Sequence, residues 1–181
     1  MNYTNILKNC RIYVDMDGTM VVWKAAKSLE DLLEKGYFRG MPPYESVVTA
    51  IKILIAYGAN VYALSAYMEE NPYSVQEKNE WLDEFIPEIP AEKRIFCPCG
   101  TNKWEAVINA SGGTPPQENL LLDDYSFNLH QWKEKGGVGI KLMNGVNGNN
   151  GTWQGEKISR FLPPLSIADE IVRVAAGIYS I

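Results

Sequence analysis

The sequence predicts an α/β fold in which helices pack on both faces of a parallel sheet of about five strands. Five short apolar segments, each followed by polar or turn residues, are typical of strands buried on both faces of a sheet. Helix patterns with their own start and stop signals lie between these segments. Such an alternation favours right-handed βαβ crossovers and a doubly wound sheet, in which ligands bind at the carboxyl ends of the strands.

The expected strands and helices follow one another along the chain. The strands are expected at residues 12–14, 60–64, 94–97, 119–122 and 138–142. The helices are expected at residues 44–57, 74–85, 103–110, 127–135 and 166–178. A capping box of Ser74 and Glu77 predicts the start of the second helix, and Ser166 with Asp169 predicts the start of the last one.

Two segments lie outside this alternation. Residues 21–41 form an insert after the first strand, with a short helix expected from Ser28 to Lys35. Residues 143–155 are rich in Gly and Asn, so we expect turns there, with Trp153 packing behind them. Neither segment is large enough to be a domain, and the sequence therefore predicts one domain over residues 1–181 with a small insert at about 21–41.

Composition and charge narrow the class of protein. The chain has 181 residues, of which 46% are hydrophobic and 22% charged, as in an ordinary globular domain with one core. A net charge of -5 disfavours binding of extended nucleic acid, although a local basic pocket could hold one phosphate. We expect a cytoplasmic protein without a membrane anchor, because residues 1–10 lack the apolar region of a secretory leader. The sequence does not indicate an oligomeric state.

Polar side chains follow four of the five expected strands at the point where each strand ends. The fifth strand supplies no ionisable group. Because parallel strands end at the same edge of a sheet, we expect these side chains to converge on one cleft. They are Asp15 and Asp17 after the first strand, Ser65 after the second, Lys103 after the third, and Asp123 and Asp124 after the fourth.

Four carboxylates, a hydroxyl and an ammonium in one cleft indicate phosphoryl transfer. Carboxylates this close would repel one another unless a divalent cation lay among them, and ligands that are all oxygen favour Mg²⁺. One carboxylate can then attack phosphorus while a second transfers a proton. Ser65 and Lys103 would hold the oxygens of the phosphate and stabilise the charge of the transition state.

These residues resemble the four ordered motifs of the haloacid dehalogenase (HAD) superfamily of phosphatases. The motifs are DMDGT at 15–19, Ser65 in ALSA, Lys103, and LLDD at 121–124. The resemblance covers most of the chain, from residue 12 to about 128. It implies an HAD-like core and a phosphatase that works through a phospho-aspartate intermediate.

The resemblance also implies a role for each motif residue. Asp15 would be the nucleophile, and Asp17 the general acid and base. The magnesium site would use the side chains of Asp15 and Asp123 and the backbone carbonyl of Asp17. Asp124 would support this site through a water or a hydrogen bond to a ligand, and Gly18 and Thr19 would form the tight turn after the strand.

Within the superfamily, the sequence most resembles the 5'(3')-deoxyribonucleotidases and their bacterial and phage relatives. The match is carried by DMDG and by DDxxxN at Asp123, Asp124 and Asn128. Trp23 lies where that family has an aromatic residue lining the nucleoside pocket. The sequence departs from the family in its cap, which is reduced to about residues 21–41. Phe38 and Arg39 of this insert are further candidate pocket residues.

The sequence therefore predicts a Mg²⁺-dependent phosphomonoesterase that acts on a small phosphate ester, most simply a nucleoside monophosphate. Two alternatives stay open. With so small a cap, the cleft could admit another or larger substrate, such as a sugar phosphate, a nucleic-acid end or a phosphoprotein. The chain could also be a binding protein that kept the fold and lost turnover. For Trp23, stacking on a base and packing of the insert onto the core are equally favoured. His130 is expected to be a surface or half-buried residue without a catalytic role.

Overall fold

One six-stranded parallel sheet runs through the computed structural model, which describes residues 7–24, 26–113, 119–146 and 151–178. The strand order is β3-β2-β1-β4-β5-β6, so β1 lies between β2 and β4 near the middle of the sheet. The strands are β1 (Arg11–Val14), β2 (Asn60–Tyr67), β3 (Arg94–Pro98), β4 (Asn119–Asp123), β5 (Val138–Met143) and β6 (Glu156–Ser159).

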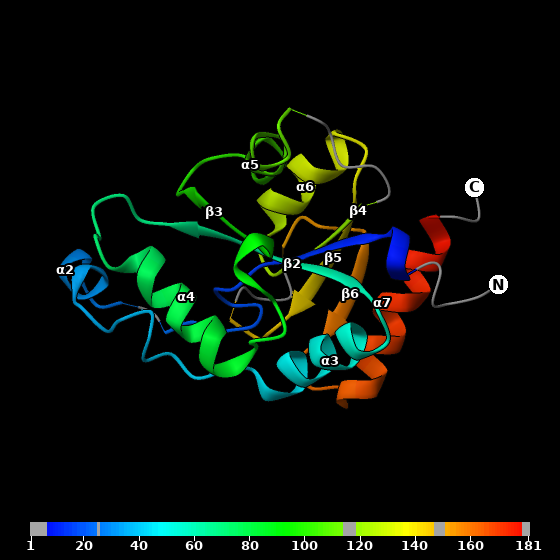
Figure 1. Ribbon diagram of the computed structural model, residues 1–181, viewed down its shortest axis with the longest axis horizontal. Helices are drawn as coiled ribbons and strands as arrows, with labels where there is room; N and C mark the ends of the chain where they lie inside the picture. Colours follow the sequence, from blue (N-terminus) through cyan, green and yellow to red (C-terminus); the bar gives the residue numbers. More distant parts are fainter. Residues whose placement is uncertain (1–6, 25, 114–118, 147–150, 179–181) are drawn as a thin grey trace.

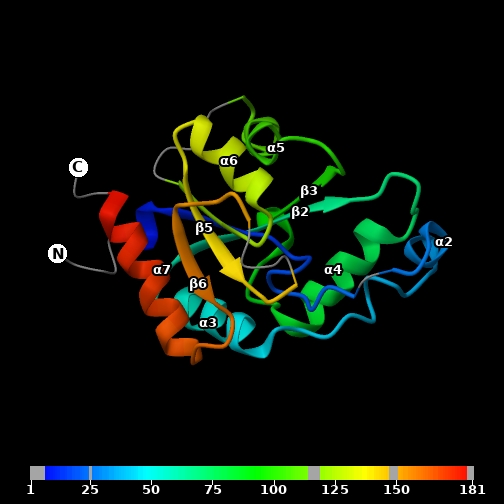
Figure 2. The ribbon, with the colours of Figure 1, turned by 180° about the vertical axis from the view of Figure 1, so that it is seen from behind.

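Helices cover both faces of this sheet, as Figures 1 and 2 show. On one face lie α5 (Lys103–Ala110) and α6 (Ser126–Glu134). On the other lie α3 (Glu45–Ala56), α4 (Ser74–Phe85) and α7 (Pro164–Ile178). The short helices are α2 (Leu29–Leu33) and η1 (Ala91–Lys93). The predicted fold class, a doubly wound parallel sheet, is confirmed.

Each face of the sheet has its own hydrophobic cluster. Alternate residues of a strand point to opposite faces, and β1 follows this rule. Ile12 and Val14 belong to the cluster under α3 and α7, whereas Tyr13 belongs to the cluster under α5 and α6. Because β1 is buried on both sides, the polar residues that follow it emerge at the middle of the sheet edge. Trp153 packs in the second cluster, as its sequence position predicted.

Two ends of the fold differ from the sequence prediction. The sheet has a sixth strand, β6, which pairs in parallel with β5 at the edge of the sheet. Its sequence, EKIS, carries one buried residue among exposed ones and so lacks the apolar run by which the other strands were predicted. Helix α7 begins at Pro164 rather than at Ser166, in keeping with the preference of proline for the first turn of a helix.

The predicted capping box at the start of α4 is wrong. Helix α4 does begin at Ser74, but no side chain caps its first turn. The Ser74 hydroxyl instead donates to the carbonyls of Met68 and Asn71. The Glu77 carboxylate accepts hydrogen bonds from the backbone of the insert, at Gly36, Phe38 and Arg39. Tertiary contacts therefore use both side chains that the local pattern assigned to the cap.

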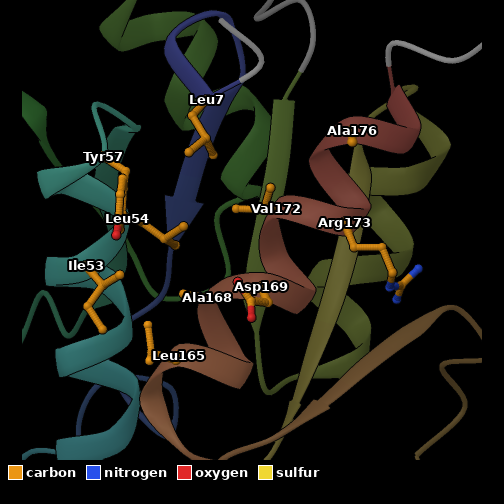
Figure 3. Close-up of a pocket in the computed structure, with 10 residues that line it drawn as sticks. All are labelled: Leu7, Ile53, Leu54, Tyr57, Leu165, Ala168, Asp169, Val172, Arg173 and Ala176. Atoms are coloured by element: carbon orange, nitrogen blue, oxygen red, sulfur yellow. The ribbon is translucent and has the colours of Figure 1, made fainter. Parts of the chain in front are cut away.

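A cavity of about 480 Å³ lies between α3 and α7. Figure 3 shows side chains from both helices lining it, among them Ile53, Leu54 and Val172, with Leu7 at one end. No polar residue predicted at a strand end lines this cavity. In the described ranges, none of the helices has the length and apolar character that a membrane span requires.

Candidate active site

The chain makes a tight turn directly after β1. The Asp15 amide still donates to the Leu122 carbonyl of β4, at 3.0 Å. The backbone then folds back, and the Met16 carbonyl accepts hydrogen bonds from the amides of Thr19 and the two residues after it. The Thr19 hydroxyl donates to Asp15 Oδ2 at 3.3 Å and accepts from the Asp124 amide at 3.1 Å. The turn thereby ties the end of β1 to the end of β4.

Gly18 gives this turn its shape. Its φ of +83° lies in the left-handed region, which residues with a Cβ rarely adopt. A Cβ at this position would overlap Asp124 Oδ2 and lie 2.7 Å from Asp124 Cγ. Glycine therefore allows both the turn and the close approach of the Asp124 carboxylate.

Three of the predicted aspartates form a compact group. Asp15, Asp123 and Asp124 are buried, and each has a carboxylate oxygen within 4.8 Å of those of the other two. Asn128 donates to Asp123 Oδ2 at 2.9 Å, and the Tyr125 amide donates to Asp123 Oδ1 at 2.8 Å. The prediction that the ends of β1 and β4 bring their carboxylates together agrees with this geometry.

Lys103 joins two of these carboxylates. Asn102 accepts a hydrogen bond from the Trp104 amide and so caps α5, which places Lys103 in the first turn of the helix. Its ammonium donates to Asp15 Oδ1 at 2.5 Å and to Asp123 Oδ2 at 2.7 Å. Burial alone would lower the pKa of Lys103, but Asp123 and Asp15 outweigh burial and raise it. Lys103 is therefore charged throughout the neutral range.

Two carboxyl groups of the site are hard to ionise. Burial, opposed in part by Lys103, raises the pKa of Asp15 to about 7. Burial, together with the charges of Asp15 and Asp123, raises the pKa of Asp124 to about 8. These shifts express the cost of placing several negative charges in a space with little water.

The second ammonium of the site belongs to Lys78, which the sequence analysis missed. Its side chain is 1% exposed. Its Nζ contacts Asp17 Oδ2, lies 3.0 Å from Ser65 Oγ, and lies 4.8 Å from the centre of the Phe38 ring. The Asp17 side chain is 23% exposed, and its carboxylate pairs with Lys78 rather than joining the group of three aspartates. Lys78 thus links the carboxylate of Asp17 to the hydroxyl of Ser65.

The position of Lys78 on α4 carried a signal. The buried side chains of α4 recur at the spacing of one helix face: Ser74, Glu77, Lys78, Trp81 and Leu82. Burying two charged residues on the inward face of a helix costs free energy unless both have partners. Charged residues at buried positions of a helix pattern therefore indicate a functional or structural contact.

Asn144 is a second residue that the sequence analysis missed. It lies just after β5, in the segment read only as turns. Its Nδ2 donates to the Gly18 carbonyl and to Asp124 Oδ2, both at 2.7 Å. Asn144 therefore holds the Asp124 carboxylate against the turn after β1.

Charge and ligand type together fit a divalent cation. If all are ionised, the four aspartates carry four negative charges and Lys78 and Lys103 carry two positive ones, which leaves a net charge of -2. A divalent cation would neutralise this excess. The three clustered carboxylates offer only oxygen ligands, as hard divalent cations prefer.

The candidate pocket residues of the insert lie in different surroundings. Trp23 is half-buried against the main hydrophobic cluster. Phe38 is buried, with its ring over the Lys78 ammonium. Arg39 pairs with Glu84 and lies 3.9 Å from Glu80, so α4 holds its guanidinium. Among the three, Phe38 contacts a residue of the site directly.

His130 is half-buried, as expected. Its Nε2 lies 2.9 Å from Thr152 Oγ1, and its ring packs against Trp153.

A solved structure with a TM-score of 0.60 agrees with this architecture. It is a haloacid dehalogenase-like family hydrolase from Streptococcus pneumoniae, at 11% sequence identity. The match covers 89% of this chain and 97% of the other. DsGPDH of Dunaliella salina superposes with a TM-score of 0.48 at 16% identity, over 77% of this chain and 25% of that one. A comparison with curated proteins finds no match.

The fold and the set of residues at its strand ends define an HAD-like hydrolase. The model of a protein family, described as 5' nucleotidase, deoxy (pyrimidine), cytosolic type C protein, matches residues 21–150. The chain belongs to this family and is a phosphoric monoester hydrolase of the nucleotidase type. The match begins just after the turn that carries Asp15 and Asp17, and it includes Ser65, Lys103 and Asp123.

Proposed function

We propose that the protein is a Mg²⁺-dependent nucleotidase that hydrolyses a nucleoside monophosphate, most simply a 5'(3')-deoxyribonucleotide, through a phospho-aspartate on Asp15. The observation that carries this proposal is the meeting of four aspartates and two lysines at the carboxyl edge of the sheet. Membership of a family described as a deoxy (pyrimidine) 5' nucleotidase supports the substrate class.

Asp15, Asp123 and Asp124 would hold the magnesium ion, together with the backbone carbonyl of Asp17. The raised pKa values of Asp15 and Asp124 support this assignment, because a bound cation would favour the ionised form of both. When bound, Mg²⁺ would neutralise the clustered carboxylates and polarise an oxygen of the phosphate.

Asp15 and Asp17 would divide the chemistry. The ionised Asp15 carboxylate would attack phosphorus, so that an Asp15 O–P bond forms as the bond to the leaving oxygen breaks. Asp17 would donate its proton to the leaving alcohol and later accept one from the water that hydrolyses the phospho-aspartate. Asp17 suits this role because it is the more exposed of the two and its carboxylate lies outside the group of three aspartates.

Ser65, Lys78 and Lys103 would bind the transferring phosphoryl group. Lys103 contacts Asp15, and Lys78 contacts Asp17 and Ser65, which supports this role for the three donors. Donors fixed in this way stabilise the charge of the transition state without reorganising.

We propose that residues 21–41 act as a reduced cap on a single HAD-like domain, and that Trp23 and Phe38 line the nucleoside side of the cleft. The contact between the Phe38 ring and Lys78 supports this placement. Arg39 would contribute by fixing the insert to α4. We also propose a cytoplasmic location, which the cytosolic type of the family and three free cysteines support.

A panel of phosphate esters tests the substrate class. The purified protein, with and without Mg²⁺, would be assayed for phosphate release from deoxyribonucleoside 5'- and 3'-monophosphates, ribonucleotides, sugar phosphates and 5'-phosphorylated oligonucleotides. We expect the highest kcat/KM for a nucleoside monophosphate and loss of activity on chelation of the metal. A preference for sugar phosphates or oligonucleotide ends would refute the nucleotidase proposal while leaving the phosphatase chemistry intact.

Trp23→Ala tests the nucleoside pocket. If Trp23 stacks on the base, its removal should raise KM for the nucleotide by about 10-fold, since stacking of a base on an aromatic ring contributes about 1–3 kcal/mol. KM for a small aryl phosphate should change little. Tyr57→Ala, which removes an exposed aromatic ring of the α3 region, is the matched control. An unchanged nucleotide KM would assign Trp23 to packing alone.

A further inference from the structure

Lys141 is a buried cation that the proposed mechanism does not use. It lies in β5, in register with Asp123 of the neighbouring strand β4. The residue is 3% exposed. Among the described residues, its ammonium has one hydrogen-bond partner, Ser126 Oγ at 2.8 Å, and no carboxylate pairs with it. An ammonium has three donors, and burying one without a counter-charge is costly, so this group has both the charge and the free donors to bind an anion.

The Lys141 ammonium borders a cavity of about 300 Å³, here called the Lys141 pocket. Ser126, His130 and Thr152 supply further polar groups to its wall, and Asp124, one of the three clustered aspartates, also lines it. Asp124 Oδ2 accepts a hydrogen bond from Asn144 and lies against Gly18, on the side of the turn after β1. The Lys141 pocket and the candidate metal site are therefore neighbours that share Asp124.

Gly151 leaves space at the ammonium. A Cβ at residue 151 would overlap Lys141 Nζ and lie 2.7 Å from Ser126 Oγ. Any other residue would push a side chain into the place where Lys141 and Ser126 meet. Glycine at residue 151 thus leaves space beside the Lys141 ammonium. This observation is independent of the charge of Lys141.

Two aromatic rings complete the wall of the Lys141 pocket. Tyr125 and Phe127 are each 56% exposed, and their ring centres lie 6.2 Å apart. Exposed aromatic rings beside a buried cation offer a surface for the organic part of an anionic ligand.

We propose that the Lys141 pocket is a second phosphate-binding subsite, in which Lys141, Ser126 and Thr152 hold a phosphate group next to the one that is hydrolysed. This inference rests on the proposed function, since it assumes that a phosphate ester binds at Asp15. The group could be a second phosphate of the substrate, as in a nucleoside 3',5'-bisphosphate, or free inorganic phosphate. The chemistry of recognition is the same in both cases.

Binding to a protein that cannot turn over its ligand tests the subsite. Full-length Asp15→Asn protein with Mg²⁺ would be titrated by calorimetry with a nucleoside 5'-monophosphate, the matching 3',5'-bisphosphate and inorganic phosphate, each with Lys141 intact and as Lys141→Met. We expect Lys141→Met to weaken bisphosphate binding by about 10- to 100-fold, as for the loss of a charge-assisted hydrogen bond, and monophosphate binding by less than about 2-fold.

The same titrations identify the source of the phosphate. Tighter binding of the bisphosphate than of the monophosphate, lost in Lys141→Met, assigns the subsite to the substrate. A second equivalent of inorganic phosphate that disappears in Lys141→Met, with no preference for the bisphosphate, assigns it to free phosphate. Equal effects of Lys141→Met on all three ligands, or none, would overturn the proposal.

Gly151→Ala provides a second variant that keeps the charge. By filling the space at the ammonium, it should weaken binding of the same ligand as Lys141→Met does. If Lys141→Met does not fold, the Gly151→Ala titration tests the subsite instead. Normal bisphosphate binding by Gly151→Ala would count against the subsite.

Hydrolysis of an aryl phosphate by the unaltered protein is measured in parallel. Absence of this activity would defeat the proposed function, whereas the titrations judge the subsite separately.

Discussion

Two buried ammonium groups contact three of the four carboxylates of the site. Lys103 contacts Asp15 and Asp123, and Lys78 contacts Asp17. The nucleophile and the acid–base group that we propose therefore have separate cationic partners. This separation allows two carboxylates of the same short turn to take different roles.

Lys78→Met should lower kcat/KM by about 10²- to 10³-fold, the usual effect of removing one fixed donor from a site that stabilises a developing charge. The change leaves Asp17 and Ser65 without their shared ammonium. Steady-state hydrolysis of a nucleoside monophosphate measures the effect, and thermal melting verifies that the variant folds. Lys157→Met, at an exposed position of β6, is the matched control. Activity within about 2-fold of the original protein would show that Lys78 serves only to pair with Asp17.

The residues of the site differ in how far the sequence could predict them. Asp15, Lys103, Asp123 and Asp124 could be predicted to converge, because the ends of parallel strands share one edge and a local motif marks each end. The inward face of α4 could mark Lys78 as buried, but its place in the site could not be predicted, because that depends on how α4 packs over the ends of β1 and β2. Asn144 was hidden in the same way, within a segment whose composition indicates only turns.

At the scale of elements, α4 connects the insert to the candidate active site. Its Glu77 carboxylate accepts hydrogen bonds from the backbone amides of Gly36, Phe38 and Arg39, and the next residue, Lys78, contacts the site. Trp81 of the same helix donates to the Met41 carbonyl at 2.8 Å. Consecutive turns of one helix thereby hold the insert and carry Lys78, one of the proposed phosphate-binding groups.

Glu77→Ala should loosen the insert. It leaves three backbone amides without their acceptor, which we expect to lower the free energy of unfolding by about 2–3 kcal/mol and to raise KM for a nucleotide more than for a small aryl phosphate. Denaturant unfolding and steady-state kinetics measure the two effects. Glu105→Ala, an exposed glutamate of α5, should change neither. If Glu77→Ala kept both its stability and its nucleotide KM, the insert would not depend on this carboxylate.

The elements themselves were predictable where local signals and burial agree. Helices α3 and α5 and the first five strands lie close to their predicted ranges, because each combines an apolar period with a clear stop signal. The prediction was wrong where tertiary contacts or pairing at an exposed sheet edge, rather than the local sequence pattern, determine the structure. Ser74 and Glu77 bind neighbouring segments instead of capping α4, and β6 is held at the edge of the sheet by pairing with β5.

At the scale of the whole molecule, the site costs stability that a bound cation would restore. Folding raises the pKa of Asp15 to about 7 and that of Asp124 to about 8, from an ordinary value of 3.8. Between about pH 4 and pH 8, the folded state therefore binds more protons than the unfolded state. The free energy of unfolding must then fall as pH rises through this window.

We therefore expect the melting temperature of the metal-free protein to fall between about pH 4 and pH 8. Saturating Mg²⁺ should reduce this fall, so that the stabilisation by Mg²⁺ grows with pH, because the cation favours the ionised carboxylates. Thermal melts at a series of pH values with chelator or with Mg²⁺ measure both effects. Asp124→Asn should flatten the metal-free profile. A metal-free protein that becomes more stable over this range would contradict the assigned pKa shifts.

The covalent role of Asp15 is tested most directly by trapping its phosphorylated form. Asp17→Asn protein with Mg²⁺ would be mixed with an aryl phosphate whose leaving group needs no proton, quenched in acid within one turnover, and mapped by mass spectrometry. The loss of a general base typically slows a step by about 10²- to 10⁴-fold, so hydrolysis of the intermediate should lag behind its formation. We expect about one phosphoryl group per chain, on the peptide that contains Asp15, and none in Asp15→Asn. A phosphoryl group on another residue, or turnover by Asp15→Asn at the original rate, would rule out Asp15 as the nucleophile.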